Sequence, residues 1–346
     1  MPPTCRDWLS VLRPHLTEPL FPHSAVDRLL SAAGDLPGDC LGILEARLGQ
    51  GAASLDLSIR LLEASQARRM AERVSAPHLR SFLAPWPEGV RSVWLEFDLD
   101  REPDPIPCAK LDADTSPSWI ADSLLPLLHG SPLSEGQRDR FLACHREIPP
   151  SGRLLYVFSL LPRGIDAVRM EVYGLGIGDV RSFLGRIAPD SVPQVLEIAP
   201  LFAGVERLHL SFDIAPEGVL PRIGLEGSFP RLPRREPRWA ELFGRLTERG
   251  LCSPEKKDAV LAWPGFETFW SAPAAWPVEA VGARGFCVRG LSHVKLVCQP
   301  GREAEAKVYL SFGYSADTRE RPERETPPDH PPGARSSPRT VRPAAP

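Results

Sequence analysis

The stretch EAKVYLSFGY (residues 305–314) is the part of the sequence that decides the fold. Lys307 and Tyr309 alternate with Val308 and Leu310, which is the period of two expected of a β-strand. One face of this strand is apolar and belongs on a core. The other face carries a lysine and a tyrosine, so it must meet either bulk water or an internal cavity.

Strands of the same kind recur in pairs along the chain. Helical stretches with a period near 3.6 precede the first pair and separate the later ones, so we expect five units, each with two helical stretches and two strands. The predicted strand pairs are 41–49 with 53–63, 92–100 with 107–114, 152–162 with 167–175, 206–216 with 220–229, and 291–301 with 305–314.

The facing of the strands leaves two arrangements open. The helices need the apolar strand faces as partners, so they should all lie on one side of the sheet. An open antiparallel sheet would leave its polar face in water. Closure would remove both sheet edges and turn the polar faces into the lining of a lumen. We favour closure, an α/β fold with a ten-stranded antiparallel β-barrel surrounded by helices; paired strands argue against a parallel doubly wound sheet.

Composition bounds the protein class. The chain has 346 residues, 42% hydrophobic and 25% charged, with a formal net charge of −3. These values predict a globular protein without a nucleic-acid-binding surface, and no apolar run is long enough to span a membrane. Seven scattered cysteines and the absence of a secretory signal predict reduced thiols and a cytoplasmic location. We expect one domain over residues 1–314 and a disordered, proline-rich tail over 315–346.

The pattern resembles the aromatic prenyltransferases of the α-β-β-α (ABBA, or PT-barrel) type, in particular the dimethylallyl-tryptophan-synthase-like branch. The segment GILEARL (42–48) is similar to that family's first strand, which implies that Glu45 is the catalytic base or hydrogen-bond acceptor. A basic residue followed at a short spacing by tyrosine is typical of the family's second strands. AKVYL (306–310) matches through Lys307 and Tyr309, and VRMEVYG (168–174) matches in part through Arg169 and Tyr173.

The resemblance implies a transferase that moves an allylic prenyl group from its diphosphate to an aromatic acceptor or a peptide side chain, without a metal or other cofactor. Tyr173 and Tyr309 would shield the carbocation. The residues implied for the diphosphate are Lys110, Arg169, Arg222, Lys295 and Lys307. The chain departs from the pattern at Asp112 and Gly224, where tyrosine is expected, and Glu171 adds a negative charge.

Two other functions stay open: a barrel that binds a small molecule or performs other chemistry without binding diphosphate, and an open-sheet interaction protein. The polar faces also carry acidic residues, including Asp56 and Glu96, which favours internal ion pairs. His209 and His293 lie on polar faces as structural or acid–base groups, and no His or Cys spacing indicates a metal. If the lumen is wet, Lys307→Ala or Arg169→Ala should leave folding nearly intact.

Overall fold

The computed structural model describes residues 2–51, 54–101, 104–281 and 285–315. The last strand ends at Ser315, one residue beyond the predicted domain boundary. Nearly all of the predicted tail, residues 316–346, lies outside the described residues.

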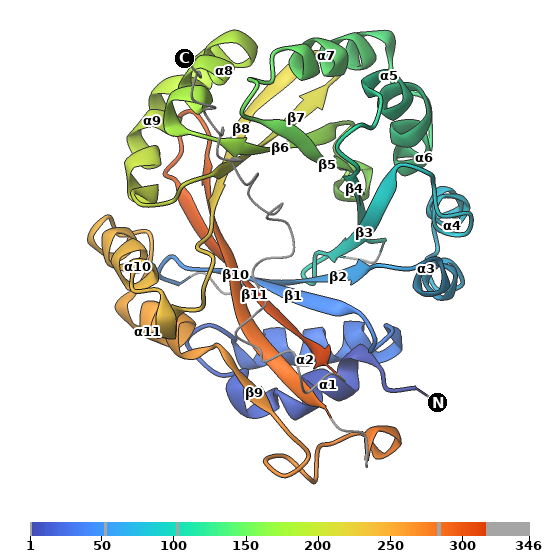
Figure 1. Cartoon of the computed structure of the whole chain (residues 1–346), viewed down its shortest axis with the longest axis vertical. Helices are drawn as coiled ribbons and strands as arrows, with labels where there is room; N and C mark the ends of the chain where they lie inside the picture. The colour runs from blue at the N-terminus through green and yellow to red at the C-terminus, as the bar shows by residue number, and fades with distance from the viewer. Residues whose placement is uncertain (1, 52–53, 102–103, 282–284, 316–346) are drawn as a thin grey trace, which may run out of the picture.

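Ten strands form a closed antiparallel barrel (Figure 1), as the sequence predicts. Each strand pairs with the next along the chain, β8 pairs with β10, and β11 pairs with both β10 and β1, which closes the ring. A three-residue strand, β9 (Gly265–Glu267), pairs with β10 outside the ring. The barrel strands are β1 (Leu41–Arg47), β2 (Leu55–Leu61), β3 (Val90–Phe97), β4 (Ile106–Leu111), β5 (Arg153–Ser159), β6 (Val168–Leu175), β7 (Leu208–Ala215), β8 (Gly218–Gly227), β10 (Phe286–Cys298) and β11 (Glu305–Ser315).

The helices surround the barrel, and helical segments precede each barrel strand pair in the described residues. The sequence sets some boundaries locally: the hydroxyl of Ser134 accepts the Gln137 N–H and caps α7. The α-helices are α1 (Cys5–Val11), α2 (His23–Ala32), α3 (Ala64–Ala71), α4 (Pro77–Leu83), α5 (Pro117–Trp119), α6 (Leu125–His129), α7 (Glu135–Arg146), α8 (Ile177–Ile187), α9 (Val192–Ile198), α10 (Arg238–Glu248) and α11 (Pro254–Ala262).

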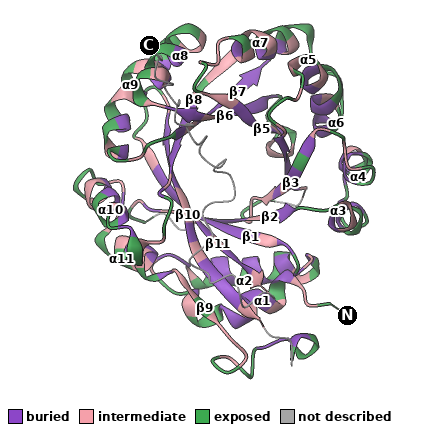
Figure 2. Cartoon of the chain, in the orientation of Figure 1, coloured by how far each residue is buried: buried purple, intermediate pink, exposed green. Residues whose placement is uncertain are grey.

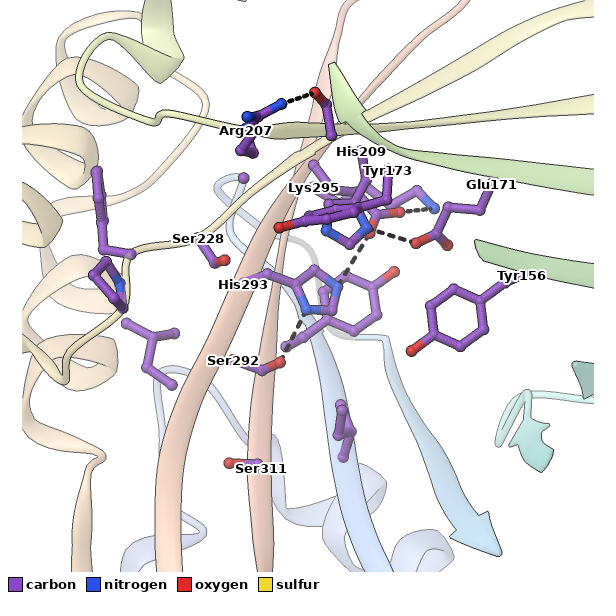
Figure 3. Close-up of a pocket in the computed structure, with 18 of the residues that line it drawn as sticks. Tyr156, Glu171, Tyr173, Arg207, His209, Ser228, Ser292, His293, Lys295 and Ser311 are labelled. Carbon is purple, nitrogen blue, oxygen red and sulfur yellow. Dashed lines mark hydrogen bonds and ion pairs between the residues drawn. The ribbon is translucent and has the colours of Figure 1, made fainter. Parts of the chain in front are cut away.

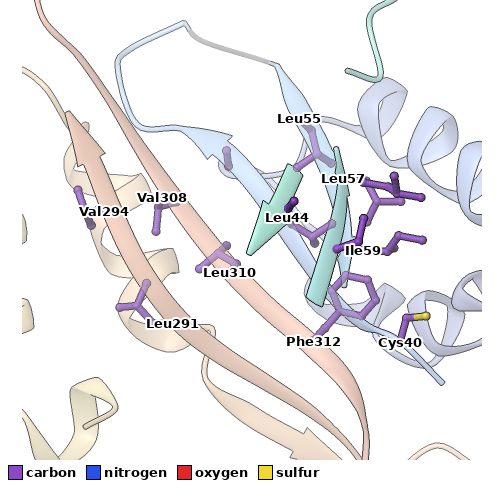
Figure 4. Close-up of a cluster of buried hydrophobic side chains, with 14 of the residues drawn as sticks. Cys40, Leu44, Leu55, Leu57, Ile59, Leu291, Val294, Val308, Leu310 and Phe312 are labelled. Carbon is purple, nitrogen blue, oxygen red and sulfur yellow. The ribbon is translucent and has the colours of Figure 1, made fainter. Parts of the chain in front are cut away.

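The hydrophobic core lies between the barrel and the helices, not inside the barrel. Leu44, Val308 and Leu310 are fully buried on the outer faces of their strands, in the layer shown in Figure 4. The helices are buried toward the sheet and exposed on the outside (Figure 2). Successive side chains of a strand point to opposite faces of the sheet. The residues that alternate with these buried ones therefore point into the barrel.

Strands β10 and β11 are longer than the others and continue past the ring toward β9. At this end Tyr314 stacks on Trp8 of α1, with ring centroids 4.5 Å apart. The N-terminal helix thus covers the outer part of the last hairpin. No helix in the described part of the chain is long and apolar enough to cross a membrane.

Candidate functional site

The polar strand faces enclose a cavity of about 1180 Å³ inside the barrel (Figure 3). Of the eight residues predicted for catalysis or substrate binding, Arg169, Tyr173, Lys295 and Tyr309 line this cavity. The other four, Glu45, Lys110, Arg222 and Lys307, lie in the barrel without lining it. Their environments differ and are described in turn.

Glu45 and Lys307 belong to an ionic cluster where β11 meets β1. Lys307 Nζ lies 2.8 Å from Glu45 Oε1, and Arg47 donates to Glu45 and to Asp56 at 2.8 Å each. Arg47 also contacts Glu305 at 3.0 Å. Burial alone would raise the pKa of Glu45, but the charges of Lys307 and Arg47 outweigh it and hold this pKa well below its usual value.

The cluster lies beyond one end of the cavity. Tyr309 lines the cavity, whereas Lys307, two residues away on the same face of β11, does not. The same step separates Ile43 from Glu45 on β1. Lys307 is only 7% exposed. The expectation that Lys307 faces a wet lumen is therefore wrong, because ion-paired side chains occupy the barrel interior beside it.

Arg169 is also neutralised by a carboxylate. Its guanidinium contacts both carboxylate oxygens of Asp213 on β7, at 2.6 and 3.1 Å, and both side chains are buried. Arg169 and Asp213 face each other in the β6–β7 register, so the sheet itself aligns this pair. Arg169 lines the cavity as expected, but only 7% of it is exposed.

A third group of charged side chains forms one wall of the cavity on β6, β7, β8 and β10. Glu171 Oε1 lies 2.8 Å from His209 Nδ1, and Lys295 Nζ lies 2.6 Å from Glu226 Oε1. His293 Nε2 lies 3.5 Å from the other oxygen of Glu226. We call these five residues the acidic–histidine wall; Figure 3 shows Glu171, His209, His293 and Lys295 gathered at the cavity.

The pKa values within this wall are shifted in opposite directions. Burial and the nearby charge of Glu226 raise the pKa of Glu171. Burial would also raise the pKa of Glu226, but Lys295 and the two histidines lower it to about 2. Burial lowers the pKa of His293 to about 4, so this imidazole is neutral at neutral pH.

Tyr309 connects the wall to the ionic cluster. Its ring stacks on His293, with centroids 4.0 Å apart. Burial raises its pKa well above the usual value, and its side chain hydrogen-bonds to Glu45. Because Glu45 is a carboxylate, the phenol is the donor.

The opposite side of the barrel pairs cations with aromatic rings. Each pair joins residues that face each other on adjacent strands: Arg60–Trp94, Lys110–Tyr156, Phe158–Arg169 and Arg153–Tyr173. In every pair the cationic group lies 5.6 to 5.9 Å from the ring centroid, within the range of a cation–π interaction. We call these eight residues, on β2 to β6, the cation–aromatic wall.

The cations of this wall repel one another. Burial lowers the pKa of Lys110 from 10.5 to about 7, and the charges of Arg60, Arg91 and Arg153 add to the effect. Lys110 is fully buried beside Tyr156, whereas Arg60 and Arg153 line the cavity. Neither of these two arginines forms an ion pair with any residue that the structure describes, so an anion in the cavity would relieve the repulsion.

Arg222 and Gly224 lie two residues apart on β8, where the resemblance implies a basic residue and a tyrosine. Arg222 forms no ion pair within the described residues, and burial followed by the nearby charge of Arg169 lowers its pKa. At Gly224 an added Cβ would lie 2.4 Å from Ser211 Oγ and 2.5 Å from Lys295 Cε. A tyrosine cannot occupy this position, because the stem of Lys295 already fills it.

Several residues that line the cavity were not predicted from the sequence. Arg60, Trp94, Arg153 and Tyr156 were not proposed as site residues, although strand alternation places Arg60 and Trp94 on polar faces. Glu226 was missed as well. The signal that could have found these residues is the cross-strand register, which a single sequence does not provide.

Comparison with known proteins supports the fold and leaves the activity open. No protein-family model and no curated protein matches the sequence. Among solved structures, the apo form of prenyltransferase PriB aligns with a TM-score of 0.53 and 16% identity, covering 89% of this chain and 94% of that one. A PriB complex with product diphosphate covers the same shares at 0.51 and 16% identity.

A structure described as 6-dimethylallyl tryptophan synthase aligns with a TM-score of 0.50 and 15% identity, covering 91% of this chain and 97% of that one. The chain therefore has the barrel fold of these prenyltransferases. At such low identity the likeness extends to the fold alone.

Proposed function

We propose that the protein is an aromatic prenyltransferase that moves an allylic group from its diphosphate to an electron-rich aromatic acceptor inside the barrel. The observation that carries this proposal is the cation–aromatic wall. Ionising an allylic diphosphate requires positive charge beside the leaving group and electron-rich rings beside the carbocation. Here both requirements meet in cross-strand pairs at a cavity large enough for two small molecules.

In the proposed reaction, the bond between the allylic carbon and the diphosphate oxygen breaks, and the electron pair leaves with the diphosphate. A ring carbon of the acceptor then bonds to the allylic cation, and the proton on that carbon passes to a base. We place the diphosphate near Arg60, Arg153 and Lys110, because these cations repel one another and an anion would stabilise them. Tyr173 and Tyr156 would border the cation.

The roles predicted for the remaining residues are part of this proposal. Lys295, Lys307 and Arg169 already contact carboxylates, so a diphosphate would have to compete for them. Arg222 has no such competitor among the described residues. Tyr309 would border the cation from the opposite side. Glu45 lies just beyond the cavity lining, and its low pKa suits it better to accept a hydrogen bond from the N–H of an acceptor that reaches this end than to remove a proton.

A second candidate function is favoured by the ion pairs themselves: a barrel that holds a small molecule, or acts on one, without binding a diphosphate. Three of the five predicted diphosphate ligands are neutralised by Glu45, Asp213 and Glu226. A ligand for this type of cavity would be neutral or would carry its own positive charge toward the acidic–histidine wall.

One set of measurements separates the two functions. Calorimetry with inorganic diphosphate and with an unreactive allylic diphosphate analogue tests for an anion site. Turnover of dimethylallyl and geranyl diphosphate over a panel of aromatic acceptors tests for transfer. Saturable binding of the analogue together with product formation supports the transferase. The absence of both analogue binding and turnover would reject the transferase in favour of the second function.

A further inference from the structure

The acidic–histidine wall combines donor atoms of the kind that bind transition metals. Glu171, His209 and Glu226 come from three adjacent strands, and one donor atom of each lies within 4.8 Å of the other two. Their closeness follows from the sheet, because His209 faces Glu226 in the β7–β8 register and faces Tyr173, two residues from Glu171, in the β6–β7 register. We propose that these three residues bind one divalent transition-metal ion at the cavity wall, with His293 as a fourth ligand.

The spacing fits a single ion with little movement. Nitrogen and oxygen ligands at 2.0–2.2 Å from one ion lie roughly 3 to 4.4 Å apart. His209 Nδ1 lies 2.8 Å from Glu171 Oε1, and the three donor atoms all lie within 4.8 Å of one another, which is compatible with this range.

Its neighbours orient His293 beside the three proposed ligands. Its Nδ1 lies 3.0 Å from the Ser292 hydroxyl, and its Nε2 points to Glu226 Oε2 at 3.5 Å. Stacking on Tyr309 fixes the plane of the ring.

Lys295 orients the proposed ligand Glu226 without binding the ion itself. Its amine holds Oε1 of Glu226 at 2.6 Å, while Oε2 lies 3.5 Å from His293 Nε2. Partners that hydrogen-bond to ligands in this way fix the orientation of a metal site. The five residues all line the cavity, which gives an ion both an entry path and open coordination positions.

The donor set indicates which ions fit. Calcium and magnesium prefer oxygen ligands alone, whereas imidazole with carboxylate suits zinc, manganese, iron or cobalt in the divalent state. The inference concerns metal binding only, so it stands whether or not the protein transfers prenyl groups.

Binding is tested on the full chain without a polyhistidine tag, after treatment with a chelator and dialysis. We expect calorimetric titration with Zn²⁺, Co²⁺ and Mn²⁺ to show one equivalent bound by at least one of them. His209→Ala and Glu226→Gln should each weaken binding by about 10- to 100-fold or more, since even loss of an outer partner costs this much. His145→Ala, on α7 outside the barrel, is the matched control and should bind as the wild type does.

Two outcomes would overturn the proposal: no stoichiometric binding of any of the three ions by the wild-type chain, or unchanged affinity in folded His209→Ala and Glu226→Gln variants. If the variants fail to fold, NMR of the wild-type chain with added Mn²⁺ tests the site instead. Mn²⁺ should broaden the ring-proton NMR signals of His209 and His293 first. Equal broadening of all the histidine signals, or broadening of others first, would also contradict the site.

Discussion

Lys307 Nζ lies 2.8 Å from Glu45 Oε1 across the seam where the last barrel strand pairs with the first. The contact joins residues 262 positions apart in the sequence, and both side chains are buried. A cation and a carboxylate are thus placed at the junction that closes the ring. The relationship ties barrel closure to charge neutralisation and leads to the first prediction.

Lys307→Met should destabilise the fold by about 3 kcal/mol, near the lower end of the range for breaking a buried ion pair, because Arg47 still contacts Glu45. Urea unfolding monitored by circular dichroism measures the change. Lys307→Met combined with Glu45→Gln should be more stable than Lys307→Met alone, since no carboxylate is then left buried without its lysine.

Arg69→Met serves as the control for this series, because it removes an exposed ion pair with Asp39. Such pairs contribute about 0–1 kcal/mol. If Lys307→Met costs no more than Arg69→Met, the buried pair does not stabilise the barrel.

Arg60→Met and Arg153→Met should each weaken binding of an unreactive allylic diphosphate analogue by roughly tenfold or more, since hydrogen bonds to charged groups contribute about 1.5–3 kcal/mol. Both arginines line the cavity at the cation–aromatic wall. Calorimetry at two salt concentrations measures the affinity and its salt dependence. Arg181→Met, on the exposed side of α8, should leave both unchanged. Affinities that match the wild type in both wall variants would move the diphosphate away from this wall.

Lys110→Met should be more stable than the wild type near pH 6, by a margin that shrinks as the pH rises. The folded-state pKa of Lys110 is lowered to about 7, so between pH 7 and 10.5 the unfolded chain binds more protons and the stability of the wild type increases with pH. Between pH 7 and 9 the margin should fall by about 1–2 kcal/mol.

Urea unfolding of Lys110→Met and wild type at pH 6, 7, 8 and 9 checks this dependence. Lys257→Met, at a half-buried position on α11 outside the barrel, makes the same substitution and is the control. A constant difference for Lys110→Met would show that its amine is not destabilised by burial.

Gly224→Ala should destabilise the protein by about 1–3 kcal/mol, the usual cost of overpacking, because its Cβ would overlap Ser211 and the stem of Lys295. Gly185→Ala, in the exposed middle of α8, has no atom within 4 Å of the new Cβ and should stabilise the chain by about 0.5–1 kcal/mol. Thermal unfolding of the two variants compares them directly. Equal melting temperatures would mean that Lys295 can leave the space above Gly224.

The architecture could be predicted from the sequence because it depends on local patterns. Alternation in stretches such as 305–314 fixes which side of each strand is apolar, and one apolar side forces the helices onto one face. The same alternation directed Lys307 and Tyr309 into the barrel. Acidic residues accompany the basic ones on the polar faces, which also favoured ion pairs, and the structure contains such pairs at Glu45, Asp213 and Glu226.

The depth and partners of each side chain were decided by the tertiary structure. Strand register sets which residues face each other, and register depends on contacts between strands that lie far apart in the sequence. Lys307 is therefore buried in an ion pair, whereas Arg60, which the sequence analysis passed over, reaches the cavity. Glu171, His209 and Glu226 likewise have no metal-binding spacing along the chain and meet only through three adjacent strands. The sequence alone determined the direction in which each strand faces, because alternation is a property of the backbone. Strand pairing in the assembled barrel decided which charges meet, because register is set between strands, and closure of the ring added the contact between Lys307 and Glu45.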